Sequence, residues 1–405
     1  MKKVRDGYKI TELGEIPSDW NIMKLSEVAE IVMGQSPDSS SYNDTEDGVA
    51  FFQGKTEFGR INPVVKKWCN NPTKISKPLD ILISVRAPVG DVNINNIEAC
   101  IGRGLGAIRA TSSSNYKYLY YAIQKYNNQL KKASQGSTFE AINSNDLKGL
   151  KLPIPHIDEQ EKIALILSNV DEQIDNVDAL IEKNKELKKG LMQTLLTKGI
   201  GHTKFKTTEI GEIPEEWEVV KLGEVCDFKQ GFQIPRSEQI LECKEGYIRY
   251  LYITDFFSDN NKLFIKESRK YYYIEPRDIA IANTGNSCGK AFRGATGVLS
   301  NNMFKIFNDK NRISDNYLWS YLNSDYYWNE LSKYFNTAGQ PHVGHKNMSQ
   351  LKIAIPNKLI EQEKIASILS EVDKKIDEYE NKKQKLEEIK KGLMQQLLTG
   401  KIRVL

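Results

Sequence analysis

Residues 159–198, EQEKIALILSNVDEQIDNVDALIEKNKELKKGLMQTLLTK, and residues 361–400, EQEKIASILSEVDKKIDEYENKKQKLEEIKKGLMQQLLTG, are two copies of one segment. A shift of 202 residues aligns them and superimposes the run KGLMQ at 189–193 on the same run at 391–395. The apolar positions of the two segments match under the same shift. We conclude that the chain contains an internal duplication.

Each copy predicts a long helix with one apolar seam. The seam residues alternate at spacings of four and three, a period of 3.5 that lets two helices stay in contact while they supercoil. They are Ile163, Leu167, Val170, Ile174, Val177 and Ile181 in the first copy and Ile365, Leu369, Val372, Ile376, Tyr379 and Leu386 in the second. Two ordinary core helices are the alternative, but the length of the segments and their charged outer faces favour a coiled coil of about 60 Å.

Composition places the chain among soluble proteins of two or three domains. It has 405 residues, of which 27% are charged, and no apolar run approaches the roughly 20 residues that span a bilayer. Five scattered cysteines fit a reducing, cytoplasmic location and give no metal framework. The net charge of the chain is +4. The two helical segments together carry a charge of −3, so the remainder of the chain carries +7. A basic remainder is compatible with a polyanionic partner.

The duplication extends to the segment that precedes each globular region. Residues 8–28, YKITELGEIPSDWNIMKLSEV, match residues 205–225, FKTTEIGEIPEEWEVVKLGEV. The regions between are less alike, but RGLGAIRA at 103–110 occupies the place of NNMFKIFN at 301–308. Alternating apolar runs, turns and helical stretches predict mixed α/β globules.

The expected fold is therefore α+β, with two globular α/β domains separated by an antiparallel coiled coil in a pseudo-two-fold cyclic arrangement. The expected boundaries are 1–155 for the first globule, 156–200 for the first helix, 201–357 for the second globule and 358–405 for the second helix. The second anchor segment follows a helix directly, whereas the first has no helix before it. If both anchors pack alike, residues 8–20 dock against the end of the second helix, and the two chain termini lie close together.

These features resemble the DNA-specificity subunit of type I restriction-modification enzymes. The resemblance lies in the GEIPxxW entries at 14–20 and 211–217, the LPIP exit at 152–155, the EQEKIA starts at 159–164 and 361–366, and the KKGLMQ-LLT ends. RAPVG at 86–90 and STFEAIN at 137–143 also resemble the first domain of this family. The counterpart of STFEAIN in the second globule, AGQPHVGHKNM at 338–348, departs from the pattern, so no residue roles are transferred there.

The resemblance implies a non-catalytic protein that reads a two-part site in double-stranded DNA, one half-site for each globule. It implies two modification subunits as partners, which methylate adenine with S-adenosylmethionine. It also implies restriction subunits that use ATP and magnesium. No cofactor is expected in this chain itself, and no membrane partner.

No stretch predicts catalysis. GNSCGK at 285–290 fails the spacing of a phosphate loop and is followed by alanine instead of Ser or Thr. His342 and His345 form an HxxH pair without nearby cysteine or carboxylate ligands, so a surface loop is the simpler interpretation. Asn71-Pro72-Thr73 is not the loop that holds a flipped adenine. We expect neither a metal nor a catalytic residue.

Candidate DNA contacts are the polar side chains on turns between apolar runs, because Arg and Lys read guanine while Asn and Gln read adenine. They are Lys55, Arg86, Arg103, Gln135 and Ser137 in the first globule and Gln233, Arg236, Asn286, Lys290, His342, His345 and Lys346 in the second. The alternative function is a coiled-coil adaptor that joins two protein-binding globules without touching DNA. The target sequence and the gap between half-sites do not follow from these residues.

Overall fold

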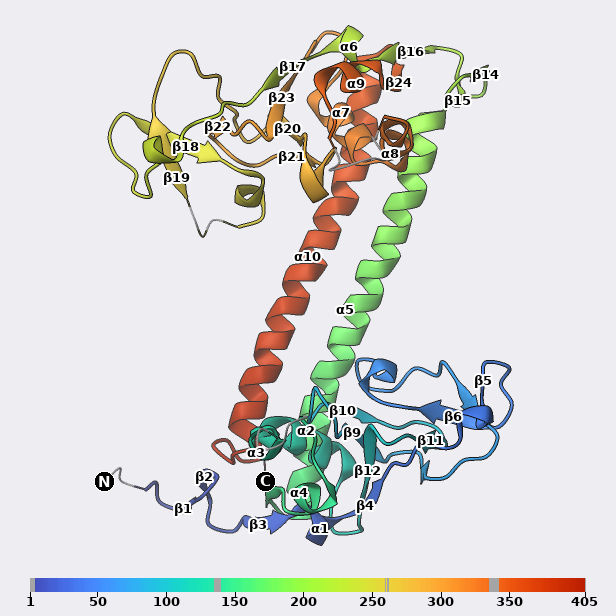
Figure 1. Cartoon of the computed structure of the whole chain (residues 1–405), viewed down its shortest axis with the longest axis vertical. Helices are drawn as coiled ribbons and strands as arrows, with labels where there is room; N and C mark the ends of the chain where they lie inside the picture. The colour runs from blue at the N-terminus through green and yellow to red at the C-terminus, as the bar shows by residue number, and fades with distance from the viewer. Residues whose placement is uncertain (1–3, 135–139, 259, 261, 335–341, 405) are drawn as a thin grey trace. The chain divides into compact units, whose positions relative to one another are not determined.

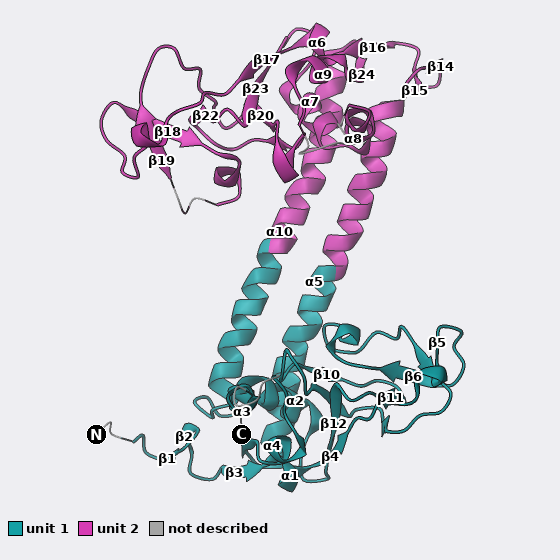
Figure 2. Cartoon of the chain, in the orientation of Figure 1, with its two compact units in different colours: residues 1–178, 381–405 teal, residues 179–380 magenta. Residues whose placement is uncertain are grey.

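The computed structural model describes residues 4–134, 140–258, 260, 262–334 and 342–404. Contacts divide the chain into two compact units, which Figure 2 shows in different colours. Unit 1 is Met1–Asp178 with Asn381–Leu405, and unit 2 is Ala179–Glu380. Each unit therefore combines one globule with part of each long helix. The bounds of neither unit coincide with those of a single predicted domain.

The two duplicated segments form the longest helices, α5 (Ile157–Lys198) and α10 (Leu359–Leu397). Within the seam, Tyr379 is half-buried and the other eleven expected residues are buried. In unit 1 the start of α5, with Ile163 and Leu167, shares a core with Leu397 and Leu398 at the end of α10. In unit 2, Leu195 and Leu196 of α5 pack in one core with the start of α10.

Ion pairs show that the helices run antiparallel in each unit. In unit 1, Asp171 pairs with Lys390 at 2.8 Å and Asp178 with Lys383 at 2.7 Å. The residue number of the partner on α10 therefore falls as the residue number along α5 rises. In unit 2, Lys188 pairs with Asp373 at 2.6 Å. The shift of 202 residues converts the Asp171–Lys390 pair into the Asp373–Lys188 pair, so the duplication makes the same bond once in each unit. The predicted antiparallel pairing is confirmed.

Unit 1 contains a four-stranded and a five-stranded sheet, in the orders β10-β9-β12-β4 and β5-β7-β6-β11-β8, beside the short pairs β1-β2 and β13-β3. Helices α1 to α4 accompany the sheets (Figure 1). The strands are β1 (Tyr8–Thr11), β2 (Gly14–Pro17), β3 (Asn21–Lys24), β4 (Ala29–Met33), β5 (Tyr42–Asn43), β6 (Val49–Phe52), β7 (Trp68–Cys69), β8 (Ile75–Ser76), β9 (Ile81–Ser84), β10 (Val92–Ile94), β11 (Ala99–Ile101), β12 (Leu105–Ala110) and β13 (Lys151–Ile154). The helices are α1 (Leu25–Val28), α2 (Tyr116–Tyr126), α3 (Asn128–Ser134) and α4 (Ser144–Lys148).

Unit 2 repeats this plan with a four-stranded sheet of order β17-β23-β20-β21, a three-stranded sheet of order β19-β18-β22, and the pairs β14-β15 and β16-β24. The strands are β14 (Phe205–Thr208), β15 (Gly211–Pro214), β16 (Trp217–Lys221), β17 (Cys226–Gln230), β18 (Tyr247–Leu251), β19 (Leu263–Lys266), β20 (Ile279–Ala282), β21 (Ala291–Phe292), β22 (Val298–Leu299), β23 (Met303–Asn308) and β24 (Lys352–Pro356). The helices are α6 (Leu222–Val225), α7 (Asp315–Leu322), α8 (Asp325–Ser332) and α9 (His345–Gln350). The mixed α/β prediction holds for both units.

The N-terminal anchor of unit 1 docks on the end of α10, as the cyclic arrangement requires. The Tyr8 hydroxyl donates to the carbonyl of Gly400 at 2.8 Å. Arg403 forms bonds of 2.8 Å to both Asp19 and Glu159, and the indole Nε1 of Trp20 donates to Glu159 at 3.0 Å. The two ends of the chain are thus joined by hydrogen bonds across nearly 400 positions, and the prediction that residues 8–20 dock there is confirmed.

The second anchor makes the corresponding contact in unit 2. Here His202 takes the place of Arg403, and its Nε2 lies 2.8 Å from Glu361, the counterpart of Glu159. Glycines with φ of +63° and +64°, Gly199 and Gly400, end the two long helices. A Cβ atom at either would lie within 3.3 Å of the tryptophan of its anchor, so both positions require glycine.

A buried carboxylate fixes the globule of unit 1 to the long helices. Asp171 is 1% exposed and accepts bonds from Arg60 Nη1 at 2.8 Å, Tyr121 Oη at 2.6 Å and Lys390 Nζ at 2.8 Å. Arg60 also bonds Asp175. Burial and the bond to Asp171 raise the pKa of Tyr121, so its hydroxyl stays protonated as a donor.

Along the described chain, no helix combines the length and apolar character needed to cross a membrane.

Candidate nucleic-acid interface

The strand order of unit 1 brings three separate loops to one edge. β6 and β11 are parallel, so the chain leaves both strands, after Phe52 and Ile101, on the same side. β12 is antiparallel to β9, and therefore begins where β9 ends. The loops that carry Gln53, Arg86 and Arg103 meet as a consequence of this pairing.

These loops line a concave surface that encloses a volume of about 530 Å³. Its lining includes Gln53, Lys55, Arg86 and Arg103, which we call the arginine edge. The structure thus brings together Lys55, Arg86 and Arg103, three of the five DNA-binding candidates predicted for the first globule. Their spacing in sequence spans 48 residues, from 55 to 103, and only the tertiary fold places them side by side.

The cations of this edge differ in their partners. Lys55 forms an ion pair with Asp91. Arg86 and Arg103 are exposed, and among the described residues neither guanidinium has a hydrogen-bond or ion-pair partner. Two unpaired guanidinium groups beside a hollow can bind phosphate or the edge of a base.

Gln135 and Ser137 lie outside the described residues. The chain that follows them borders the arginine edge, because Glu140 O accepts a bond from Ala87 N at 3.0 Å. Arg86 and Ala141 form an isolated antiparallel bridge. A DNA contact by Gln135 or Ser137 stays a prediction.

Backbone hydrogen bonds identify the same edge in unit 2. Val85 N donates to Gly104 O at 2.9 Å, and Asn283 N donates to Asn302 O at 3.0 Å. Likewise Gly102 N bonds Phe52 O at 2.8 Å, as Ser300 N bonds Leu251 O at 2.8 Å. These two correspondences place Thr284 at the position of Arg86, Asn301 at that of Arg103, and Asn302 at that of Gly104.

The edge of unit 2 consists of Thr284, Asn301, Asn302 and His342, which we call the asparagine edge. His342 forms an antiparallel bridge with Thr284, as Ala141 does with Arg86 in unit 1. Asn301, Asn302 and His342 are exposed. The side chains of Asn301 and Asn302 have no partner in the part of the chain that is described. The backbone of the two edges is thus alike and the side chains are not.

The other candidates of unit 2 are distributed around this edge. Asn286 and Lys290 are exposed on the turn that follows β20. Gln233 and Arg236 are exposed after β17, and Gln233 corresponds to Ser36, whose Oγ accepts from Arg103 N at 3.2 Å. Lys346 is exposed on α9. Contact with DNA by any of these five stays a prediction.

His345 differs from the other candidates, because aromatic rings surround it. Its ring centroid lies 4.9 Å from that of Phe304 and 6.3 Å from that of Phe228. Burial lowers the pKa of His345, with a smaller contribution from the charge of Lys229. The half-buried ring therefore packs against both phenylalanines, and contact of His345 with DNA stays a prediction. Within the described ranges, no group of three or more His, Cys, Asp or Glu side chains could hold a metal ion.

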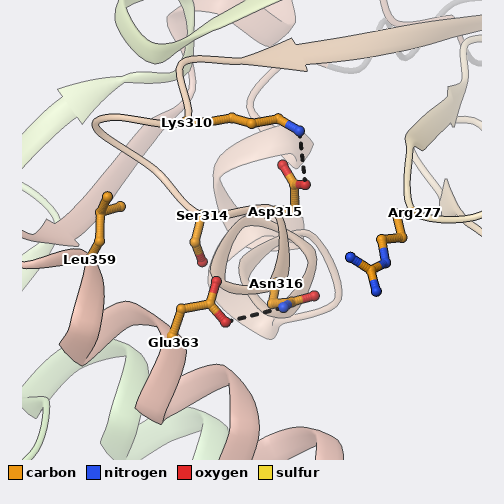
Figure 3. Close-up of a pocket in the computed structure, with 7 residues that line it drawn as sticks. All are labelled: Arg277, Lys310, Ser314, Asp315, Asn316, Leu359 and Glu363. Carbon is orange, nitrogen blue, oxygen red and sulfur yellow. Dashed lines mark hydrogen bonds and ion pairs between the residues drawn. The ribbon is translucent and has the colours of Figure 1, made fainter.

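Each unit also has a groove where its long helix begins. Figure 3 shows the groove of unit 2, about 520 Å³, in which Glu363 accepts from Asn316 at 3.2 Å and Lys310 pairs with Asp315 at 3.5 Å. Leu359 lies on its rim. A groove of about 440 Å³ in unit 1 includes Ile157 and Glu161, the counterparts of Leu359 and Glu363 under the 202-residue shift. The duplication has therefore preserved a groove as well as a helix.

Sequence reasoning missed Gln53, Thr284, Asn301 and Asn302 as members of the two edges. The signal for the asparagines was available, because the alignment of residues 103–110 with 301–308 already pairs Arg103 with Asn301. Gln53 had no such signal. It reaches the edge through the parallel pairing of β6 with β11, which joins strands about 50 residues apart.

Comparison with known proteins agrees with this duplicated plan. The family model for the type I restriction modification DNA specificity domain matches residues 17–187 and again 214–390. A putative type I restriction enzyme MjaX specificity subunit of Methanocaldococcus jannaschii is 41% identical over 204 residues, which cover 49% of this chain and 47% of that protein. The MjaVIII specificity subunit of the same organism is 28% identical over 96% of this chain and 94% of its own.

A solved structure supports the fold. The crystal structure of a type I restriction-modification S subunit from M. genitalium aligns with a TM-score of 0.65 and 18% identity, covering 98% of this chain and 97% of that one. Because the family model covers most of the chain in two copies, the chain belongs to the type I restriction-modification DNA specificity family, whose specificity subunits are recognition proteins and not enzymes, and it carries two target-recognition domains.

Proposed function

We propose that this chain reads a bipartite site in double-stranded DNA, with one half-site for the arginine edge and one for the asparagine edge. One observation carries this proposal. Two units of one chain present the same backbone edge with different side chains, the exposed Arg86 and Arg103 in one and the half-buried Thr284 and exposed Asn301 in the other. A shared scaffold with unlike polar side chains is suited to reading two unlike short sequences.

The long helices would set the gap between the half-sites. Each unit contains part of both α5 and α10, and antiparallel ion pairs hold the two helices in register in both. A helix pair of fixed length keeps two recognition units at a constant spacing, and half-sites on one face of DNA recur about every 34–36 Å. A longer or shorter helix pair would therefore select a different gap.

The duplicated grooves support the proposal of two modification subunits. The two grooves lie at corresponding places and share an apolar residue, Leu359 or Ile157, and a glutamate, Glu363 or Glu161, so one asymmetric chain offers two equivalent docking places. Two copies of one partner fit that arrangement. S-adenosylmethionine, ATP and magnesium would then be bound by the modification and restriction subunits.

The test is a selection from random DNA with the native complex, purified through an affinity tag on this chain. Enrichment of two short conserved blocks separated by a constant number of unspecified bases supports the proposal. Mass spectrometry of the purified complex should show two copies of a methyltransferase subunit for each copy of this chain. If no sequence is enriched and the chain copurifies only with proteins unrelated to DNA, the adaptor function is correct instead.

The gap can be tested separately. Insertion of seven residues, one heptad, between Ala179 and Leu180 of α5 and a matching heptad after Glu380 of α10 keeps the seam in phase. The enriched blocks should keep their sequences and move apart. An unchanged gap with unchanged blocks would refute the role of the helices as the spacer.

A further inference from the structure

The turn that carries Arg103 is rigid and presents a single long side chain. Gly102 and Gly104 flank Arg103, and a Cβ atom at Gly104 would lie 2.5 Å from Gln53 O. Leu105 N donates to Gly102 O at 3.0 Å and Arg103 N donates to Ser36 Oγ at 3.2 Å, which fixes the backbone on both sides. Base contacts need this kind of preorganised support.

The same turn in unit 2 is closed by the same bond but presents amides. Met303 N donates to Ser300 O at 3.0 Å, the counterpart of the Leu105–Gly102 bond. Between these residues lie Asn301 and Asn302, both exposed. Gln230 Nε2 and Asn283 Nδ2 both donate to the carbonyl of Asn301, which holds its backbone while its amide side chain stays free of described partners.

The two side chains differ in the base that they recognise. A guanidinium donates two parallel hydrogen bonds to O6 and N7 of guanine, whereas an asparagine amide pairs with N6 and N7 of adenine. Building on the proposed function, we infer that Arg103 and Asn301 are corresponding specificity residues, and that Arg103 selects guanine in one half-site while Asn301 selects adenine in the other.

The surroundings of Arg103 support a base contact. The neighbouring cation Lys55 is neutralised by Asp91, so it competes weakly for an acceptor. Arg86 lines the same concave surface, has no partner among the described residues and is available for a phosphate or a second base. Contacts to phosphate position a protein without specifying sequence. The two roles are therefore separable by experiment.

The test compares selections from random DNA with the native complex that contains wild-type chain, Arg103→Asn, Arg103→Lys or Asn301→Arg. In the wild-type selection, one block should contain a guanine that depends on Arg103 and the other an adenine that depends on Asn301. Each base should be favoured roughly 10- to 100-fold over the other bases. Arg103→Asn should replace the guanine preference by adenine and leave the other block unchanged. Asn301→Arg should produce the reverse change in the other block only.

Arg103→Lys is the matched control because it keeps the charge but loses the planar fork. It should retain binding to DNA without the motif and weaken the guanine preference, because the lysine ammonium can contact guanine but lacks two fixed parallel donors. An unfolding midpoint equal to that of wild type shows that a variant is folded. If Arg103→Asn does not fold, the base preference of Arg103→Lys decides whether Arg103 contacts a base or a phosphate.

Two results would overturn the inference while leaving the proposed function intact. One is a uniform loss of affinity for all sequences with an unchanged motif, which assigns Arg103 to phosphate. The other is a change in a block that contains no guanine. Failure of the wild-type complex to enrich any sequence would instead refute the proposed function itself.

Discussion

At the scale of single residues, duplication has placed one carboxylate in two environments. Asp171 is buried and bonded to Arg60, Tyr121 and Lys390, whereas the side chain of its counterpart Asp373 is 40% exposed and pairs with Lys188. A buried charge that loses its partner costs far more than an exposed one. The same chemical group should therefore differ in its contribution to stability.

Asp171→Ala should lower the free energy of unfolding by about 3–5 kcal/mol, since it leaves the partly buried Lys390 ammonium without its acceptor and the Arg60 guanidinium with Asp175 as its only carboxylate. The matched control, Asp373→Ala, should cost about 0–1 kcal/mol. Urea denaturation followed by circular dichroism measures both. Equal losses in the two variants would contradict the importance of burial at Asp171.

A second residue-scale prediction concerns pH and His345. Burial lowers its pKa in the folded chain below the ordinary 6.5, so the unfolded chain binds the proton more readily. The contribution of this residue to stability is therefore present above pH 6.5 and is lost as the pH falls below it, through the folded-state pKa.

His345→Phe should remove this part of the pH dependence between pH 7 and pH 5, because phenylalanine keeps the stacked contact with Phe228 and the edge-to-face contact with Phe304 without a titrating group. The buried Nε2 of His345 has no hydrogen-bond partner among described residues, so its loss costs little. Thermal unfolding at several pH values tests this. The control is a substitution of the exposed histidine, His342→Gln. Its unfolding temperature should depend on pH in the same way as that of wild type.

At the scale of elements, the glycine that ends α10 is constrained by what packs on it. Gly400 has a φ of +64°, and a Cβ atom there would lie 2.4 Å from Pro17 of the first anchor. Gly190, inside α5, is exposed and has nothing within 4 Å of a built Cβ. One glycine is thus required by geometry, and the other merely weakens a helix.

Gly400→Ala should therefore destabilise unit 1 by about 1–3 kcal/mol, because both the backbone conformation and the contact with Pro17 become unfavourable. Gly190→Ala should stabilise the chain by roughly 0.5–1 kcal/mol, since alanine favours helix. Differential scanning calorimetry distinguishes the two directions. A neutral Gly400→Ala would show that the anchor does not dock on α10 as described.

At the scale of the whole molecule, the first anchor and the C-terminal segment are bonded to each other through Tyr8–Gly400 and Asp19–Arg403. The segment between α5 and β14, which includes His202, is the equivalent junction of unit 2 and is continuous in sequence. The fold is therefore a cycle that is opened at one of two similar junctions.

A circular permutant with residues 405 and 1 joined by a short Gly/Ser linker and new ends between His202 and Thr203 should fold and enrich the same DNA motif, since chain ends near junctions are well tolerated. A permutant opened between Ser168 and Asn169, inside α5, should be strongly destabilised because it interrupts a helix. Circular dichroism and DNA selection test both. Loss of folding in the first permutant alone would refute the cyclic arrangement.

The duplication and the two long helices could be predicted from the sequence alone, because a repeat and a 3.5-residue apolar period are local patterns that can be read along the chain. The antiparallel pairing was predicted from the two anchor segments, which pack alike only if residues 8–20 dock at the end of the second helix. The sequence also paired Arg103 with Asn301 through alignment of residues 103–110 with 301–308. Only the tertiary structure decided which polar residues share an edge, because Lys55, Arg86 and Arg103 meet through strand pairings between distant segments. Packing likewise decided that Asp171 is buried under Arg60 and that His345 lies among aromatic rings, since burial depends on neighbours far away in sequence.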